Sequence, residues 1–184
     1  ESQRMARMID DLLSLSRVEA SERLRPQDQV NISELLEKTR ELLLSRAEER
    51  KMELIFEIES NLPSLPGDQD ELMEVFQNLI DNAIKYGLDA APVTVSAKIV
   101  NSIPEIGGKG IAISIKNKGE GIAADQIPRL TERFYRIDKG RSRKLGGTGL
   151  GLAIVKHIVS HHRGWLDTKS AAGEGATFTV YRPF

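Results

Sequence analysis

The sequence predicts an α+β fold, a two-layer α/β sandwich in which helices cover one face of a mixed sheet, with an amphipathic helix in front of it. Three observations carry this prediction. Two capped amphipathic helices bracket a short alternating run. Two β-rich runs then follow each other in hairpin fashion. A glycine-rich loop, a third helix and two more strands complete the chain, and this order of elements is typical of such a sandwich.

The composition is ordinary for a globular domain of 184 residues, with room for one core and an appendage. A net charge of −1 gives no general attraction to nucleic acid or acidic membranes. The absence of cysteine excludes disulfides, thiolate metal sites and a cysteine nucleophile. No apolar run reaches the ~20 residues that span a bilayer. We therefore expect no direct contact with nucleic acid or membrane, and the helical pattern already present at Glu1 indicates a piece of a longer protein.

Residues 2–20 form a helix with a narrow apolar seam. The seam contains Met5, Met8, Leu12 and Leu15, with Ile9 and Leu13 beside them. A lone amphipathic helix needs a partner, which is either its own domain or, as the narrow seam favours, a bundle or dimer interface. The polar stretch 20–29 suits a linker. We therefore divide the chain at residues 1–27 and 28–184.

The main domain begins with a helix that Asn31 and Glu34 can cap, followed by a half-buried strand over residues 52–58. Asp68 and Glu71 form a second capping box. The helix that follows them buries Leu72, Val75, Phe76, Leu79, Ile80 and Ala83. Strands are predicted at 93–100 and 110–117, a helix at 150–161, and strands near 165–170 and 177–182.

Three motifs point to a nucleotide. On the second helix, Asn78, Asn82, Lys85 and Tyr86 share one stripe, and a carboxamide oxygen is a hard donor suited to Mg²⁺. Residues 146–152, Gly-Gly-Thr-Gly-Leu-Gly-Leu, precede an apolar helix and can place backbone N–H groups on phosphate oxygens. Residues 117–122, at a strand end, let a flat ring approach closely. Taken singly, these are also compatible with a solvated helix face and two flexible turns.

In this order and spacing, the motifs resemble those of the histidine-kinase catalytic domain in the Bergerat superfamily of gyrase, Hsp90, histidine kinases and MutL. The resemblance covers about residues 28–184. Its boxes match residues 78–86, 117–122, 132–136, 147–152 and 173–178. The helix at residues 5–19 resembles the second helix of that family's dimerisation and phosphotransfer bundle. Residues 132–136 and 147–159 look most like phosphate-regulon sensor kinases.

The resemblance implies ATP and Mg²⁺ as cofactors and gives each matched residue a role. Asn82 would bind Mg²⁺, Asn78 and Lys85 would lie near the phosphates, and Tyr86 would lie near the nucleoside. The other nucleotide contacts that it implies are Asn117, Gly119, Gly121, Ile122, Gly147, Thr148, Gly149, Leu150, Gly151 and Thr177. Residues 129–148 would form a lid over the triphosphate. In its basic run we expect Arg141 and Arg143 to contact phosphate, although a solvated surface also explains such a run.

The implied activity is transfer of the γ-phosphoryl group of Mg·ATP to a histidine on a bundle helix. The family's acceptor signature, His-Glu-x-Arg-Thr-Pro, is absent, and none of His157, His161 and His162 is followed by an acid. The expected partners are therefore an acceptor bundle, its own or a partner's, and a response regulator. The expected setting is a homodimer of the full-length protein, in the cytoplasmic portion of an inner-membrane sensor.

Three positions bear on this interpretation. Asn117 stands where the family has Asp, so we expect weaker but not abolished base recognition. Thr131 stands where the family has Phe, which thins the lid anchor. An ATPase of the gyrase or MutL kind would carry Glu at position 78, and the Asn found there cannot accept a proton at neutral pH. Asn78 favours the kinase over an ATP-driven conformational switch, while a nucleotide-binding scaffold without catalysis stays an alternative.

Overall fold

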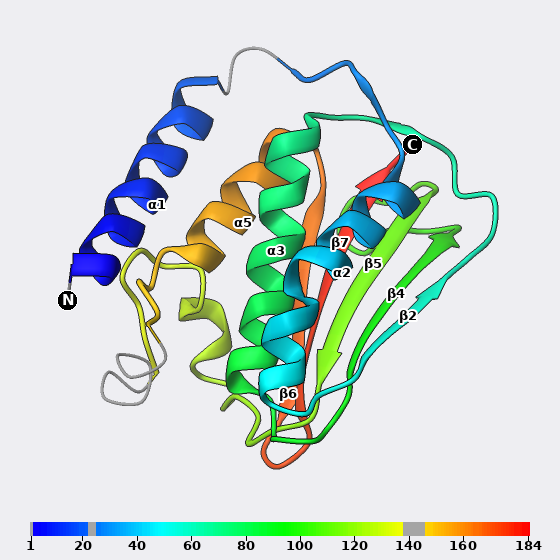
Figure 1. Ribbon diagram of the computed structural model, residues 1–184. Coiled ribbons are helices and arrows are strands. Elements are labelled where there is room, and N and C mark those ends of the chain that lie inside the picture. The colour runs from blue at the N-terminus through cyan, green and yellow to red at the C-terminus, as the bar shows by residue number, and fades with distance from the viewer. Residues whose placement is uncertain (1, 22–24, 138–145) are drawn as a thin grey trace.

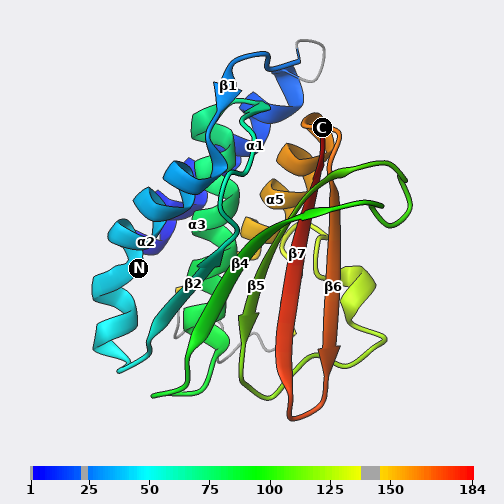
Figure 2. The same ribbon diagram turned by 90° about the vertical axis from the view of Figure 1, so that its right-hand side faces the viewer.

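The computed structural model describes residues 2–21, 25–137 and 146–184 (Figure 1). A mixed five-stranded sheet has the order β2-β4-β5-β7-β6. Its strands are β2 (Leu54–Ile58), β4 (Val93–Val100), β5 (Gly110–Asn117), β6 (Trp165–Ala171) and β7 (Gly175–Pro183). Helices α2 (Ile32–Glu49), α3 (Gln69–Tyr86) and α5 (Gly151–His161) lie on one face of this sheet (Figures 1 and 2). The predicted α+β sandwich is therefore confirmed.

The strand pairing follows from the connections. Strands β2 and β4 are parallel, with Leu54 opposite Val93, because α3 carries the chain back across the sheet between them. The remaining neighbours β4–β5, β5–β7 and β7–β6 are antiparallel. A two-residue ladder of β1 (Gln29–Val30) and β3 (Leu65–Pro66) was not predicted, since two residues are too few to show a period.

The core lies between α3 and the sheet. The apolar face of α3 is completely buried at Leu72, Val75, Phe76, Leu79 and Ile80. The sheet supplies Val95, Ile113 and Ile115, which are also completely buried. Each such side chain contributes about 1.5–3 kcal/mol on leaving water. This packing holds the polar stripe beside the apolar face of α3 in one orientation.

Both predicted helix caps are present, but neither closes as a reciprocal box. Asn31 accepts from the Glu34 N–H at 3.2 Å, and Asp68 accepts from the Glu71 N–H at 2.9 Å. In the second box the Asp68 N–H, which would donate to Glu71 in a closed box, donates instead to His162 Nε2 at 3.0 Å. The reason is that the Glu71 carboxylate is occupied by His161 Nδ1 at 2.9 Å.

The N-terminal helix α1 (Ser2–Ser21) divides its apolar seam between two environments (Figure 1). Leu15 and Val18 are buried against the domain, and α1 packs on α5. By contrast, the side chains of Met5, Ile9, Leu12 and Leu13 are exposed. The seam thus packs partly on its own domain, and the remainder is an exposed apolar face. Among the described helices, none combines the length and apolarity needed to cross a membrane.

Candidate functional site

A cavity of about 340 Å³ opens between α3, the end of β5, the start of β7 and the start of α5. It gathers most of the residues that the sequence singled out. Those lining it are Asn78, Asn82, Lys85, Tyr86, Asn117, Gly119, Gly121, Ile122, Gly147, Thr148, Gly149 and Gly151. Segments more than one hundred residues apart in the chain therefore share one concave surface, as a small-molecule site requires.

The polar stripe of α3 meets the start of α5 at a close contact made by a glycine. Asn78 donates from Nδ2 to the Glu74 carbonyl at 3.0 Å. A Cβ atom at Gly151 would lie 2.7 Å from Asn78 Oδ1, closer than side-chain carbons come to oxygen. The missing side chain at Gly151 thus lets the N-terminus of α5 approach the Asn78 carboxamide of α3.

Charged side chains cluster at this end of the cavity. Lys85 Nζ lies 2.6 Å from Asp81 Oδ2, and Arg46 from α2 binds the other oxygen of the same carboxylate. Charged residues lining the cavity comprise four basic and three acidic side chains, namely Arg7, Arg46, Lys85 and Arg136 against Asp11, Asp81 and Glu120. The described lining is therefore slightly cationic. Arg46 belongs to none of the motifs, so the sequence alone did not predict its place in the cavity.

The opposite end of the cavity is formed by the end of β5. Asn117 is buried, donates from Nδ2 to the Ala83 carbonyl at 3.2 Å, and accepts at Oδ1 from the Ala176 N–H at 2.9 Å. These backbone partners fix which side of the amide is oxygen. Gly121 has φ +78°, and a Cβ there would collide with the Ala171 carbonyl. The turn after β5 thus lies flat against the β6–β7 hairpin.

The glycine loop, residues 146–149, leads directly into α5. Leu150 is its N-cap residue and has no side-chain capping bond, while its own side chain is completely buried in the core. Leu150 therefore does not line the cavity by its side chain, and any contact with a ligand would come from its backbone. The Phe134 N–H donates to the Gly149 carbonyl at 2.8 Å and ties the segment before residue 138 to the loop.

Two side chains of α1 complete the cavity wall. Arg7 and Asp11 line it, and Thr148 Oγ1 donates to Asp11 Oδ2 at 2.5 Å. Burial raises the pKa of Asp11, and the Thr148 hydrogen bond acts in the opposite direction. Sequence reasoning did not find these residues, because it assigned α1 to a separate bundle.

The remaining predicted residues lie elsewhere. Arg141 and Arg143 fall outside the described residues. Thr177 does not line the cavity, and contributes instead to a separate hollow with Lys116 and Lys169. The physical reason is the period of two along β7, which directs the neighbouring Ala176 and Phe178 to the cavity.

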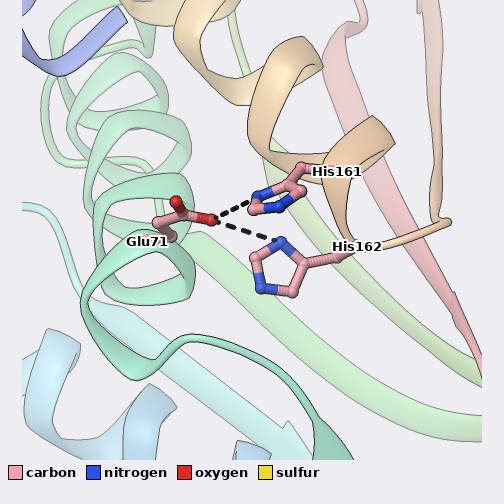
Figure 3. Close-up of side chains that lie close together, drawn as sticks. All are labelled: Glu71, His161 and His162. Atoms are coloured by element: carbon pink, nitrogen blue, oxygen red, sulfur yellow. Dashed lines mark hydrogen bonds and ion pairs between the residues drawn. The ribbon is translucent and has the colours of Figure 1, made fainter. Parts of the chain in front are cut away.

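The three histidines are placed at α5. His162 Nδ1 lies 2.8 Å from the Ile158 carbonyl and Nε2 accepts from the Asp68 N–H, so the ring is held as the neutral Nδ1–H tautomer. His161 and His162 cluster with Glu71 (Figure 3). A metal ion bound to His162 Nδ1 would break the hydrogen bond to Ile158. It would also move the ring proton to Nε2, where it would face the Asp68 N–H. These hydrogen bonds account for the cluster as a structural link between α5 and α3.

The fold and the cavity together define an ATPase domain of the α/β sandwich type. Residues 67–184 match the family described as histidine kinase-, DNA gyrase B- and HSP90-like ATPase, and the chain belongs to this family. Within the family its curated relatives are sensor histidine kinases. SenX3 of Mycolicibacterium smegmatis is 37% identical over all of this chain, which covers 46% of that protein. WalK of Bacillus subtilis is 37% identical, with 29% of its length covered.

Other matches agree. PhoR of Pseudomonas aeruginosa is 34% identical over 97% of this chain, which covers 38% of that protein. The chain thus spans less than half the length of these relatives, and several kinds of sensor kinase match it at similar identity. Full-length ShkA, solved in complex with AMPPNP, superposes with TM-score 0.81 at 28% identity over 98% of this chain and 36% of its own. The mycobacterial kinase MprB superposes with TM-score 0.68 at 25% identity, over 86% of this chain and 99% of its own.

Proposed function

We propose that this chain binds Mg·ATP in the cavity and transfers the γ-phosphoryl group to a histidine on a bundle helix outside this sequence. The observation that carries the proposal is the meeting of the α3 stripe with the glycine loop around one cavity. Membership of the histidine kinase ATPase family supports ATP as the nucleotide. The named relatives support a histidine as the acceptor.

The side chains present fit a magnesium ion beside α3. Asn82 lines the cavity, and its carboxamide makes no hydrogen bond to any described residue. Asn78 uses its amide nitrogen on Glu74, which leaves its oxygen beside Gly151. Carboxamide oxygens are hard ligands that suit Mg²⁺, which also keeps water and phosphate ligands. Bound there, the ion would neutralise phosphate charge.

Phosphoryl transfer depends mainly on positioning and on electrostatic stabilisation. In this proposal Lys85 exchanges its bond with Asp81 for a phosphate oxygen, and Arg46 holds the Asp81 carboxylate. The start of α5 offers backbone N–H groups to the phosphates. Arg141 and Arg143 belong to the proposal as γ-phosphate contacts, although they lie outside the described residues.

At the other end, Asn117 is proposed to accept a hydrogen bond from the adenine amine. Its Oδ1 has one lone pair on the Ala176 N–H and a second available to a ligand. Gly119, Gly121 and Ile122 would line the ring, and Tyr86 would lie near the nucleoside. Ala176, rather than Thr177, occupies the β7 position that faces the base.

The acceptor histidine is proposed to come from outside this sequence. The side chains of His161 and His162 are 3% and 1% exposed, and both are bonded within the domain. His157 Nε2 lies 3.8 Å from the Glu19 carboxylate. The proposed partners are therefore an acceptor bundle, within a homodimer of the longer protein, and a response regulator. The proposed place is the cytoplasmic side of a membrane-bound sensor.

Thermal unfolding with and without Mg·ATP tests the binding step. Nucleotide at 100 times its Kd should add about 2.7 kcal/mol to the free energy of unfolding. Asn82→Ala should remove the dependence on Mg²⁺. Asp70→Ala, an exposed residue of the same helix, should behave like wild type. Equal melting of wild type with and without millimolar Mg·ATP would refute the proposal.

The transfer step is tested by mixing the chain, radiolabelled ATP and a separately made acceptor bundle. The expected product is acid-labile phosphate on the bundle, formed only when the chain and Mg²⁺ are both present. Binding of Mg·ATP without any label on acceptor bundles of the matched relatives would favour a nucleotide-binding scaffold instead.

A further inference from the structure

Helix α1 carries two opposite charges to the glycine loop. Arg7 and Asp11 lie one helical turn apart, and both line the cavity. Asp11 Oδ2 accepts from Thr148 Oγ1 at 2.5 Å, and Arg7 Nη1 lies 3.5 Å from the Gly146 carbonyl. Residues separated by more than 130 positions thus meet at the point where the loop enters α5.

The Asp11 contact occupies groups that a phosphate would use. Thr148 Oγ1 donates to Asp11 and accepts from the Leu150 N–H at 3.3 Å, just before α5 begins. The N-terminus of a helix favours an anion through its free N–H groups and its dipole. The Asp11 carboxylate already supplies a negative charge at this place, and it would repel a triphosphate that arrives there.

Docking of α1 does not depend on Asp11 alone. Leu15 and Val18 are buried against the domain, and Ser14 Oγ lies 2.6 and 2.7 Å from the two Glu74 oxygens. Farther along, Glu19 pairs with Arg133, in the segment that bonds the glycine loop. Removing Asp11 therefore leaves most of the α1 interface in place, which makes the carboxylate separable from the helix.

We propose that docked α1 restrains nucleotide binding, because the Asp11 carboxylate competes with the phosphates of ATP for Thr148 and the start of α5. This inference rests on the nucleotide site proposed above and adds its regulation. Coupling between two binding events is reciprocal. Bound ATP therefore weakens docking of the Asp11 end of α1 by the same factor by which docked Asp11 weakens the binding of ATP. A signal that moves α1 would reach the nucleotide through this contact.

The test uses the full chain and titration calorimetry with Mg·ATP at fixed salt. Coupling factors of this kind are typically 5–150-fold, so Asp11→Ala should bind about tenfold more tightly than wild type. Asp11→Asn keeps an acceptor for Thr148 without the charge and should lie between them. Asp10→Ala, which removes the same charge from the neighbouring exposed position, should stay within about twofold of wild type.

A second readout follows α1 itself. The chain has no cysteine, so single cysteines replacing Gln3 on α1 and Lys38 on α2, both exposed, can carry spin labels. A non-hydrolysable Mg·ATP analogue should broaden the distance distribution between them in wild type. Asp11→Ala should show little further change on adding the analogue, because the competing contact is already gone.

Unchanged affinity of Asp11→Ala would overturn the inference. Weaker binding would overturn it too, since it would mean that the carboxylate supports the site. Neither outcome touches the proposed function as long as wild type binds Mg·ATP. Failure of wild type to bind at millimolar nucleotide would instead refute the site on which the inference rests.

Discussion

Asn117 has both ends of its amide engaged within the protein. Its nitrogen reaches the Ala83 carbonyl near the end of α3, and its oxygen receives the Ala176 N–H of β7. The residue thus joins α3, the end of β5 and the start of β7 at one end of the cavity. A carboxylate cannot replace it without loss, because it has no N–H to donate to Ala83.

This arrangement revises the expectation for Asn117→Asp. From the sequence alone, a charged acceptor should tighten ATP binding a few fold. The structure adds an opposing effect, since the carboxylate would face the Ala83 carbonyl in a buried place. We expect Asn117→Asp to lower the free energy of unfolding by about 1–3 kcal/mol without nucleotide. Thermal denaturation measures this, with Asn101→Asp as an exposed control. Unchanged melting would show that the amide bond to Ala83 contributes nothing.

The neutral state of His162 gives a second prediction at this scale. Burial lowers its pKa to about 4, with smaller contributions in the same direction from Arg182 and His161, while Asp68 and the Ile158 bond oppose them. The unfolded chain binds the proton near pH 6.5, so it holds more protons than the folded chain between about pH 6.5 and 4. Stability should therefore fall as the pH is lowered through this window, by up to about 3 kcal/mol.

Denaturant unfolding at several pH values measures this effect. Half-buried Asp11 and Glu74, whose pKa values are raised by desolvation, act in the opposite direction, since the folded state takes up their protons more readily. His162→Gln should flatten the profile between pH 6.5 and 4. Identical profiles of the His162 variant and wild type would contradict the assignment.

At the scale of elements, the site depends on how closely α5 approaches α3. The two helices pack on each other, and Gly151 stands where a side chain would press on Asn78. At their other ends the same two helices are joined by two hydrogen bonds, one between the Asp68 N–H and His162 Nε2 and one between His161 Nδ1 and the Glu71 carboxylate. The pair is therefore fixed at one end by hydrogen bonds and brought together at the other by a missing side chain.

Gly151→Ala tests that approach. The added methyl group would lie 2.7 Å from Asn78 Oδ1, so either the start of α5 or the Asn78 side chain must move. Misplacement of this size at the proposed phosphate site should weaken the binding of Mg·ATP at least tenfold. Folding should be nearly unaffected, because alanine favours a helix more than glycine does. Lys156→Ala, on the exposed face of α5, is the control. Wild-type affinity in Gly151→Ala would show that the contact is not needed.

At this scale the sequence predicted those features that depend on the spacing of residues within a single element. The stripe of α3 and the glycine loop follow from spacing alone, and they lie in one cavity. Thr177 lies outside this cavity, and a family box does not reveal which residues of a strand share a face. Arg46 and Asp11 went unnoticed because their roles arise from tertiary contacts with Asp81 and Thr148. No periodicity within α1 or α2 could have shown these contacts.

At the scale of the whole molecule, α1 and the sandwich present two different surfaces. The apolar side chains of Met5, Ile9, Leu12 and Leu13 remain exposed on α1, away from the domain. Opposite charges on the same helix reach into the cavity. One helix therefore lines the cavity and also carries an apolar face of the kind that packs in helical bundles. Movement of α1 in response to a partner would change both surfaces together.

The last prediction concerns what the molecule does alone with ATP. Water needs a base to attack the γ-phosphoryl group, and at position 78 the chain has an asparagine, which cannot accept a proton at neutral pH. The three histidines lie in or just after α5, with His161 and His162 buried and bonded. We expect neither rapid hydrolysis nor self-labelling. Incubation with radiolabelled ATP measures both: released phosphate reports hydrolysis, and label on the protein, tested for acid and alkali lability, reports self-labelling.

A separately made acceptor bundle in the same reaction serves as the positive control, since it should become labelled in trans. Asn78→Glu is the informative variant, because it restores a base of the kind that the gyrase-like ATPases carry at this position. If it folds and binds Mg·ATP, its hydrolysis rate should exceed that of wild type. Acid-labile phosphate on the isolated wild-type chain would contradict the prediction. His157 would then be the first acceptor to test, because its side chain is 32% exposed, ten times more than that of His161.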